Sequence, residues 1–351
     1  MNEIIKIDWY RSKVDKALLN NLMRKSDARA FAQVLPQLAL FGGTGALAYL
    51  AFLNIHAANW TLAVPLVLMV LFVHGSLAHF FGGSACHELT HKTPFRTPFW
   101  NSFFLSVYAF LGWFHPVSYR VSHVKHHQAT VHEDLDGEVI LPQGMDWHGV
   151  SFILEALTCN PFFPLNLLRN WSHAAFGDPS RSSFLSADWM GKILPESNIV
   201  LRRDFRNWAR TVLFGHLVLA SLFFLTGHWF LIIIVNFGTQ YCGWLELLCG
   251  APQHIGLASN VSDFRLCCRT YTCGRFPGFL YWNMQYHLEH HMYPAVPFYN
   301  LPRLREAIEH DLPPATHGLW ATWKELIPIM QRQRREPDYV FLPCLPPCEN
   351  Q

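Results

Sequence analysis

The sequence predicts an all-helical integral membrane protein with four transmembrane helices, interfacial helices and a cytoplasmic helical cap. Composition is the first observation. Of the 351 residues, 51% are hydrophobic and only 15% are charged, whereas a soluble domain carries about 25% charged residues. The second observation is that the charges are unevenly distributed. No Lys, Arg, Asp or Glu occurs from Phe31 to Phe81, and no Lys or Arg occurs from Thr211 to Phe264.

The longest apolar runs lie inside these gaps and predict membrane-spanning helices near 35–55, 60–82, 210–226 and 228–249. Each is close to the length of about 20 residues that a helix needs to cross the hydrocarbon layer. Residues 99–114 form a shorter apolar stretch with basic residues on both sides. We expect an interfacial or re-entrant helix there that returns to the same side of the membrane. Residues 151–171 have the same interpretation.

The predicted membrane domain covers residues 31–330. It follows a cytoplasmic N-terminal segment, residues 1–30, and precedes an extended tail, residues 331–351, that is rich in proline and charge.

Basic residues predict the orientation in the membrane. The short connections HAAN and TGH, between the first two and the last two predicted spans, contain no Lys or Arg. All 27 Lys and Arg residues therefore lie in the N-terminal, middle and C-terminal segments. The positive-inside rule places these three segments, with both termini, in the cytoplasm. Such a chain would reside in the endoplasmic reticulum or the bacterial inner membrane. The net charge of +2 gives no support for a nucleic-acid partner.

Histidines form three motifs with helical spacing. They are HELTH with His87 and His91, HVKHH with His123, His126 and His127, and HLEHH with His287, His290 and His291. On a helix, positions i, i+3 and i+4 share a face. Eight imidazoles at one place would repel one another if protonated, and a bound cation removes that problem. Because imidazole binds iron, zinc, copper and nickel, the spacing does not identify the metal.

HELTH alone is also the signature of a zinc protease. Intramembrane members of that class take a third ligand from an LDG-like motif, and Leu135-Asp136-Gly137 is present here. However, HELTH lies at the predicted membrane boundary, and LDG lies in the charged loop EDLDGE. A four-coordinate zinc also leaves six further clustered histidines without a role. Eight or nine nitrogen ligands suit two metals better, with four or five ligands each. A histidine-rich metal carrier is the other alternative, but its ligands should lie inside the spans.

The three motifs, set between two pairs of predicted membrane helices, resemble the integral-membrane fatty acid desaturase and hydroxylase superfamily. The resemblance runs from about Phe72 to Leu304 and includes HHQATVHEDLDGE and NMQYHLEHHMYPAVPFYNLPRL. It implies two non-haem irons held by the eight motif histidines. A ninth ligand is implied after the last span, where APQHIG offers His254.

The resemblance further implies dioxygen as co-substrate and oxidation of an aliphatic C–H, above all desaturation of a fatty-acyl chain. A hydroxylase, epoxidase or ketolase acting on a lipid, terpenoid or secondary metabolite is the alternative on the same scaffold. The only His-Pro pair, His115-Pro116, lacks the glycines of a fused haem domain. Electrons would therefore come from a separate b-type cytochrome or ferredoxin with its reductase.

Several acidic residues are candidates to hold the second nitrogen of a metal-bound histidine, as carboxylates commonly do. The candidates near the motifs are Glu88, Glu133, Asp134, Asp136 and Glu289. A solvated surface charge is the alternative for each of them. Glu246 is the only acidic residue within the four predicted spans, and an intramembrane carboxylate is a candidate functional residue. We expect it at the inner wall of the active site, with a helix-end role as the alternative.

Overall fold

The computed structural model describes residues 7–139, 150–158, 160, 162–182 and 184–346. These residues are mostly helical, as predicted, and include two strands of two residues each. Three helices are long and apolar enough to cross a membrane: α2 (Asp27–Leu53), α10 (Ile199–Leu225) and the continuous run Trp60–His91. That run joins α3 (Trp60–Ala78), η1 (His79–Phe81) and α4 (Ser84–His91). The first three predicted spans are therefore confirmed as helices of sufficient length and apolar character.

The middle of the chain consists of shorter helices: α5 (Pro98–Leu111), α6 (Pro116–Gln128), α7 (Val150–Leu157), α8 (Phe163–Phe176), η2 (Pro179–Ser182) and α9 (Ala187–Ile193). With 14 residues, α5 is about 21 Å long, too short for a hydrocarbon layer of about 30 Å. The stretch predicted at 151–171 is divided between α7 and α8, and α8 packs along α10.

The C-terminal half comprises the π-helix η3 (Ile232–Asn236), α11 (Trp244–Gly250), η4 (Ala251–Gln253), α12 (Phe264–Cys267), α13 (Arg275–Leu280), α14 (His287–Met292), η5 (Phe298–Asn300), α15 (Leu301–Ile308), η6 (Glu309–Asp311) and α16 (Leu319–Arg335). Strands β1 (Tyr271–Thr272) and β2 (Thr316–His317) pair in parallel, with Tyr271 opposite Thr316. Near the N-terminus lies α1 (Lys16–Leu22). Of the predicted tail, residues 331–335 are not extended but belong to α16, and residues 336–346 form neither helix nor strand.

The fourth predicted span, 228–249, is not a single helix. Residues 237–243 separate η3 from α11 and are not helical. A Cβ on Gly238 would lie 2.1 Å from the carbonyl oxygen of Ile234 and 2.7 Å from Nε2 of His74. Thr239 donates its hydroxyl to the Leu111 carbonyl, and Gln240 donates to the Gly112 carbonyl. Because non-helical backbone at membrane depth is tolerated where protein buries it, these contacts account for the break.

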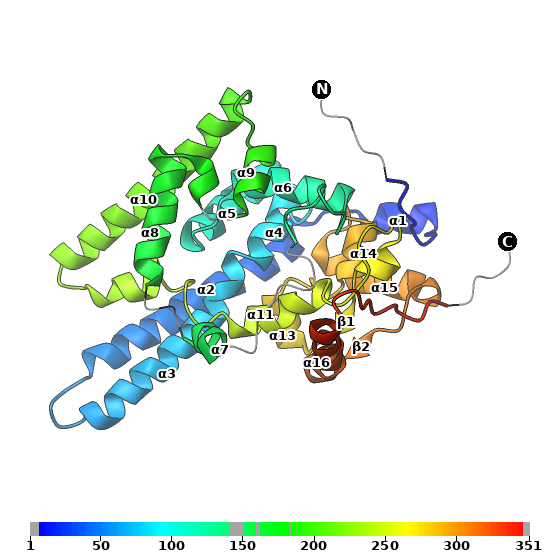
Figure 1. Cartoon of the computed structure of the whole chain (residues 1–351). Coiled ribbons are helices and arrows are strands. Elements are labelled where there is room, and N and C mark those ends of the chain that lie inside the picture. The colour runs from blue at the N-terminus through cyan, green and yellow to red at the C-terminus, as the bar shows by residue number, and fades with distance from the viewer. Residues whose placement is uncertain (1–6, 140–149, 159, 161, 183, 347–351) are drawn as a thin grey trace.

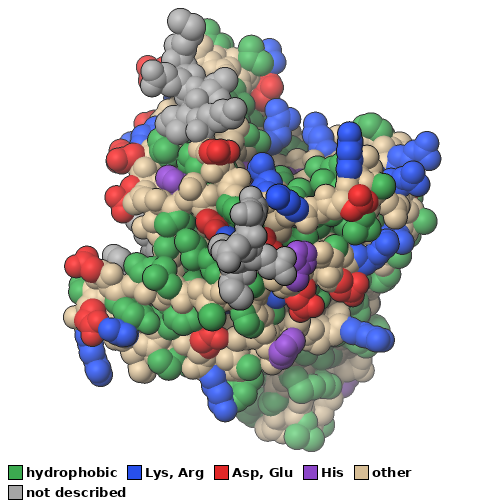
Figure 2. Space-filling model, turned by 90° about the vertical axis from the view of Figure 1, so that its right-hand side faces the viewer, with side chains coloured by type: hydrophobic (Ala, Val, Ile, Leu, Met, Phe, Trp, Pro, Cys, Tyr) green, Lys and Arg blue, Asp and Glu red, His purple; other side chains and the backbone are tan. Residues whose placement is uncertain are grey.

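The helices form two arms that meet in a cap (Figure 1). One arm is the antiparallel pair α2 and α3, and the other is α8 with α10. The cap holds α14, α15 and α16 together with α1. Side chains of α2, α3 and α10 such as Leu50, Leu62 and Leu225 are largely exposed, as expected for surfaces that contact lipid. The cap face in Figure 2 instead carries Lys, Arg, Asp and Glu among its hydrophobic side chains.

Candidate metal centre

Nine histidines from four parts of the chain meet beneath the cap. His87 and His91 come from α4, three come from α6, three from α14, and His254 directly follows η4. They form two groups, in each of which the candidate ligand atoms all lie within 4.8 Å of one another. The five-histidine group is His87, His91, His123, His127 and His290, and the four-histidine group is His126, His254, His287 and His291.

Helical spacing explains how the histidines divide between the groups. In α6, His123 and His127 are four residues apart and enter the five-histidine group, whereas His126 turns to the other group. In α14, His287 and His291 enter the four-histidine group, and His290 turns to the five-histidine group. Since α6 and α14 each supply both groups, the two groups must be neighbours.

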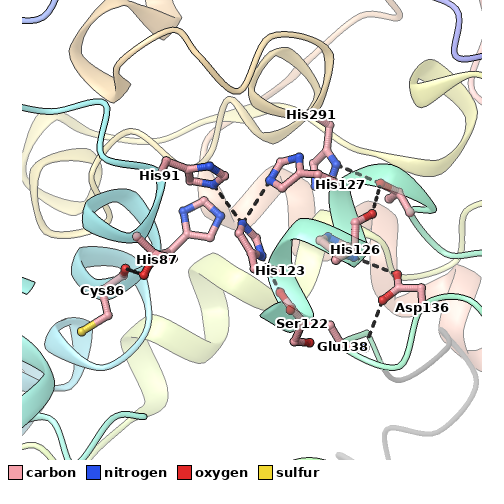
Figure 3. A network of polar contacts seen from close by, with 12 residues as sticks. Cys86, His87, His91, Ser122, His123, His126, His127, Asp136, Glu138 and His291 are labelled. Carbon is pink, nitrogen blue, oxygen red and sulfur yellow. Dashed lines mark hydrogen bonds and ion pairs between the residues drawn. The ribbon is translucent and has the colours of Figure 1, made fainter. Parts of the chain in front are cut away.

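Ring nitrogens face one another in the five-histidine group, as Figure 3 shows for His91, His123 and His127. The Nε2 of His123 lies 2.9 Å from Nε2 of His91 and 3.0 Å from Nε2 of His127. Nε2 of His290 lies 3.1 Å from that of His91. Nε2 of His87 is buried and has no hydrogen-bond partner among the described residues. The helices α4 and α6 contact each other, so the chain returns to α4 after α5.

The four-histidine group reveals why these nitrogens suit a cation. His254 Nδ1 lies 2.7 Å from the Cys267 carbonyl oxygen. A carbonyl only accepts, so Nδ1 carries the proton and Nε2 presents a lone pair. Nε2 of His254 lies 2.9 Å from Nε2 of His287. Nε2 of His291 lies 3.0 Å from the same His287 nitrogen. Separations near 3 Å match neighbouring imidazole nitrogens that each lie about 2.1 Å from one metal ion. The donor set therefore fits a metal ion.

Carboxylates hold the second nitrogen of several of these rings. Asp136 Oδ2 lies 2.7 Å from Nδ1 of His126, and Glu138 Oε1 lies 2.6 Å from Nδ1 of His123. Figure 3 shows the Asp136 carboxylate on the opposite side of α6 from His87. Glu88 Oε1 lies 3.2 Å from Nδ1 of His87 and 3.7 Å from Nδ1 of His290. Such partners fix the tautomer so that Nε2 points its lone pair at a metal.

Burial sets the protonation of the rings. It lowers the pKa of His254 to about 3. It also lowers the pKa of other group members well below the usual value, with neighbouring imidazoles adding to the effect; these are His123, His127, His287, His290 and His291. Burial acts the same way on His126, but the Asp136 carboxylate outweighs it and raises that pKa. Most rings are therefore neutral and able to coordinate metal at physiological pH.

The acidic residues predicted near the motifs have three different environments. Glu88 and Asp136 contact candidate ligands, as described. Glu289 is fully buried, but its carboxylate accepts from Arg305 Nη1 at 3.0 Å and from the Thr270 hydroxyl at 2.5 Å. It thus joins α14 to α15.

The side chains of Asp134 and Glu133 are both exposed, in keeping with the alternative of a solvated surface charge. Asp134 adopts a positive φ of 64° that turns it away, and Lys192 binds its carbonyl.

Three further partners of the histidines were not predicted. Glu138 lies in EDLDGE, two residues after Asp136, so its sequence context resembled that of the named candidates. The Thr130 hydroxyl lies 3.1 Å from Nδ1 of His291, and the Cys267 carbonyl binds His254. A backbone carbonyl has no residue-type signal, so the sequence could not have identified the last of these.

The geometry also bears on the protease alternative. In LDG, Asp136 accepts from His126 and from the Val131 amide, so it serves the four-histidine group and not His87 and His91. Glu88, which would be the general base, is fully buried between two candidate ligands. Neither residue has the role that a zinc protease requires of it.

A pocket of about 240 Å³ opens beside His87. It is lined by Gly83, Ser84, His87, Phe114, Tyr119, Glu246, Gly250, Gln253, Tyr281 and Met284. Glu246 therefore lies on the wall of this pocket, together with His87. His74 of α3 is a buried core residue, since its two nitrogens contact the Thr44 hydroxyl and the Ile234 carbonyl.

Comparison with known proteins agrees with this arrangement. The family model described as fatty acid desaturase matches residues 58–323. A search of curated proteins finds no match. The matched region covers well over half of the chain and contains all nine histidines. The chain therefore belongs to the fatty acid desaturase family.

Proposed function

We propose that this protein is a membrane-bound, dioxygen-dependent di-iron oxidoreductase that oxidises an aliphatic C–H of a hydrophobic substrate. The reaction we propose is desaturation of a fatty-acyl chain. The observation that carries the proposal is the pair of neighbouring histidine groups, five and four, built from α4, α6, α14 and His254. Membership of the fatty acid desaturase family supports both the redox class and the choice of iron.

The nine histidines would hold two irons, one in each group. Bound iron supplies the activation of dioxygen that removal of hydrogen from an unactivated CH₂ requires. The chain itself presents unprotonated Nε2 atoms at the site. Asp136 and Glu138 keep the protons of His126 and His123 on Nδ1. Burial beneath the cap limits the access of water, which protects other groups from a reactive oxidant.

In the membrane, we propose four crossings, three by continuous helices and the fourth by the broken segment 228–249. His254 follows that segment and belongs to the same group as His126 of α6. The segment must therefore return to the side from which α10 departs. The lack of basic residues in the two short connections supports a cytoplasmic active site with cytoplasmic termini. A separate cytochrome or ferredoxin with its reductase would deliver electrons from that side.

Product analysis tests the proposal. The purified, iron-loaded protein is supplied with saturated acyl lipids, a reductant and ¹⁸O₂, and products are identified by mass spectrometry. Desaturation gives an alkene two hydrogens lighter without ¹⁸O. Hydroxylation, epoxidation or ketone formation would leave ¹⁸O in the product. That result would show that the protein catalyses another oxidation of the same class and not desaturation. Absence of any dioxygen-dependent product across acyl, alkyl and terpenoid substrates would overturn the proposal.

A further inference from the structure

Glu246 of α11 occupies an unusual position in the pocket beside His87. One oxygen, Oε1, accepts from the Ser84 backbone amide at 3.2 Å and from the Ser84 hydroxyl at 3.3 Å. The other oxygen, Oε2, has His79 Nε2 at 3.7 Å, beyond hydrogen-bond range. The Glu246 side chain is 17% exposed and lines the pocket. Oε2 thus retains hydrogen-bonding capacity next to the candidate metal centre.

The chain makes specific room for this carboxylate. A Cβ on Gly83 would lie 1.9 Å from Oε1 of Glu246 and 2.8 Å from its carboxyl carbon. Any residue other than glycine at this position would push the carboxylate away from the start of α4. The close approach is also what lets the Ser84 amide bind Oε1. The Ser84 backbone amide therefore fixes the position of Oε1. Because the carboxylate is rigid, the same contact also fixes the position of Oε2.

Apart from the Tyr119 phenol and from Nε2 of His87, which belongs to the candidate metal centre, the rest of the pocket is apolar or already paired. Phe114 and Met284 provide apolar wall. Gln253 donates from Nε2 to the Tyr281 hydroxyl at 2.5 Å. An unbranched hydrocarbon would fit such walls but would leave Oε2 facing CH₂ groups, and a polar group without a partner in a closed site is unfavourable. A hydrogen-bond donor on the substrate would remove that cost.

We propose that the pocket selects a chain that bears a hydroxyl group close to the carbons that are oxidised, and that Glu246 Oε2 accepts its hydrogen bond. This inference rests on the proposed function and narrows its substrate class, from any aliphatic chain to a hydroxylated lipid. Glu246 contacts substrate in this account and fixes which carbons lie beside His87. A hydrogen bond to a carboxylate in such a site corresponds to roughly ten- to hundredfold in affinity.

Binding of two matched probes tests the inference. The probes are radiolabelled 1-hexadecanol and its methyl ether, which differ in the ability to donate a hydrogen bond. Equilibrium dialysis measures their binding to the iron-loaded protein in nanodiscs, for the wild type and for Glu246→Leu. Partition of a probe into the nanodisc lipid does not affect the result, because the binding of each probe is compared between two proteins in identical nanodiscs. We expect the variant to lose at least tenfold in affinity for the alcohol and to bind the ether as the wild type does.

Two further variants secure the test. Met284→Leu changes the same wall without altering hydrogen bonding, so both probes should respond alike. Should Glu246→Leu fail to fold, Glu246→Gln retains an oxygen for Ser84 and removes the charge. It should reduce the preference for the alcohol over the ether by about threefold or more, as loss of a charge-assisted bond does. Equal binding of alcohol and ether by the wild type would overturn the inference. It would mean that Oε2 accepts its hydrogen bond from water and not from the substrate.

The readout separates this inference from the function on which it rests. Binding of the probes requires no turnover. A strong preference for the alcohol in a protein that oxidises nothing would support the pocket assignment and count against the oxidase. Oxidation of plain acyl chains together with equal binding of both probes would retain the oxidase and overturn the role of Glu246.

Discussion

At the scale of single residues, the loop EDLDGE provides a matched pair of aspartates. Asp136 binds Nδ1 of His126 at 2.7 Å, whereas Asp134, two residues earlier, is exposed. We predict that Asp136→Asn weakens metal binding about 10- to 100-fold, because the neutral amide offers one acceptor oxygen in place of two and lacks the charge that keeps the His126 proton on Nδ1. Competition with a chromophoric chelator measures the change. Asp134→Asn is the control and should bind metal as the wild type does. Equal losses in the two variants would contradict this assignment.

The residues of the site were predictable to different degrees. Eight histidines could be found from spacing, because i, i+3 and i+4 positions on a helix share a face whatever surrounds it. How they divide into groups of five and four depends on the crossing of α6 and α14, which spacing does not specify. His254 came only from the family resemblance, since a lone histidine has no periodic pattern. Glu138 and Asp134 have the same chemistry, and only the backbone conformation of the loop distinguishes them.

At the scale of helices, the ion pair between Glu289 and Arg305 locks α14 against α15. The pair is buried at 3.0 Å, and removal of one partner leaves an unpaired buried charge. We predict that Arg305→Met destabilises the protein by about 3–5 kcal/mol and releases metal from both groups, because α14 supplies three histidines. Thermal unfolding and metal analysis measure the two effects. Arg303→Met alters an exposed arginine of the same helix and should leave both unchanged; comparable losses would contradict the prediction.

The break in the fourth predicted span shows where hydropathy fails at this scale. Residues 228–249 are apolar enough for a helix, but hydropathy does not report that Thr239 and Gln240 bind carbonyls at the end of α5. Gly238 is the third residue that accounts for the break, because only glycine fits against Ile234 and His74. The first three predicted spans are helical although Gln37 and His216 within them also bind distant carbonyls, because no segment like 237–243 interrupts them.

This packing gives a second prediction about the helices. Gly238→Ala should lower the melting temperature, because its Cβ would lie 2.1 Å from a backbone oxygen. Gly191→Ala in α9 has nothing within 4 Å. It should be neutral or stabilise by up to about 1 kcal/mol, as replacement of a helical glycine usually does. Thermal unfolding of both variants provides the test. An unchanged melting temperature for Gly238→Ala would show that the segment can repack.

At the scale of the whole molecule, both ends of the chain and the histidines should lie on the cytoplasmic side. Cys344 is an exposed free thiol near the C-terminus, and Ala57 is exposed in the short connection between α2 and α3. We predict that a membrane-impermeant maleimide labels Cys344 only from the cytoplasmic face and labels Ala57→Cys only from the opposite face. Labelling of both sites from one face would contradict the proposed four crossings.

The whole account depends on two metals held by nine histidines, and metal content tests that claim most directly. The measurement is elemental analysis of the purified, detergent-solubilised wild type and of His126→Ala. We predict about two irons per chain in the wild type, in keeping with two neighbouring sites of imidazole ligands. The variant should lose iron, because its four-histidine group has only three ligands left. About one zinc per chain, retained in His126→Ala, would contradict the account and restore HELTH as a protease signature.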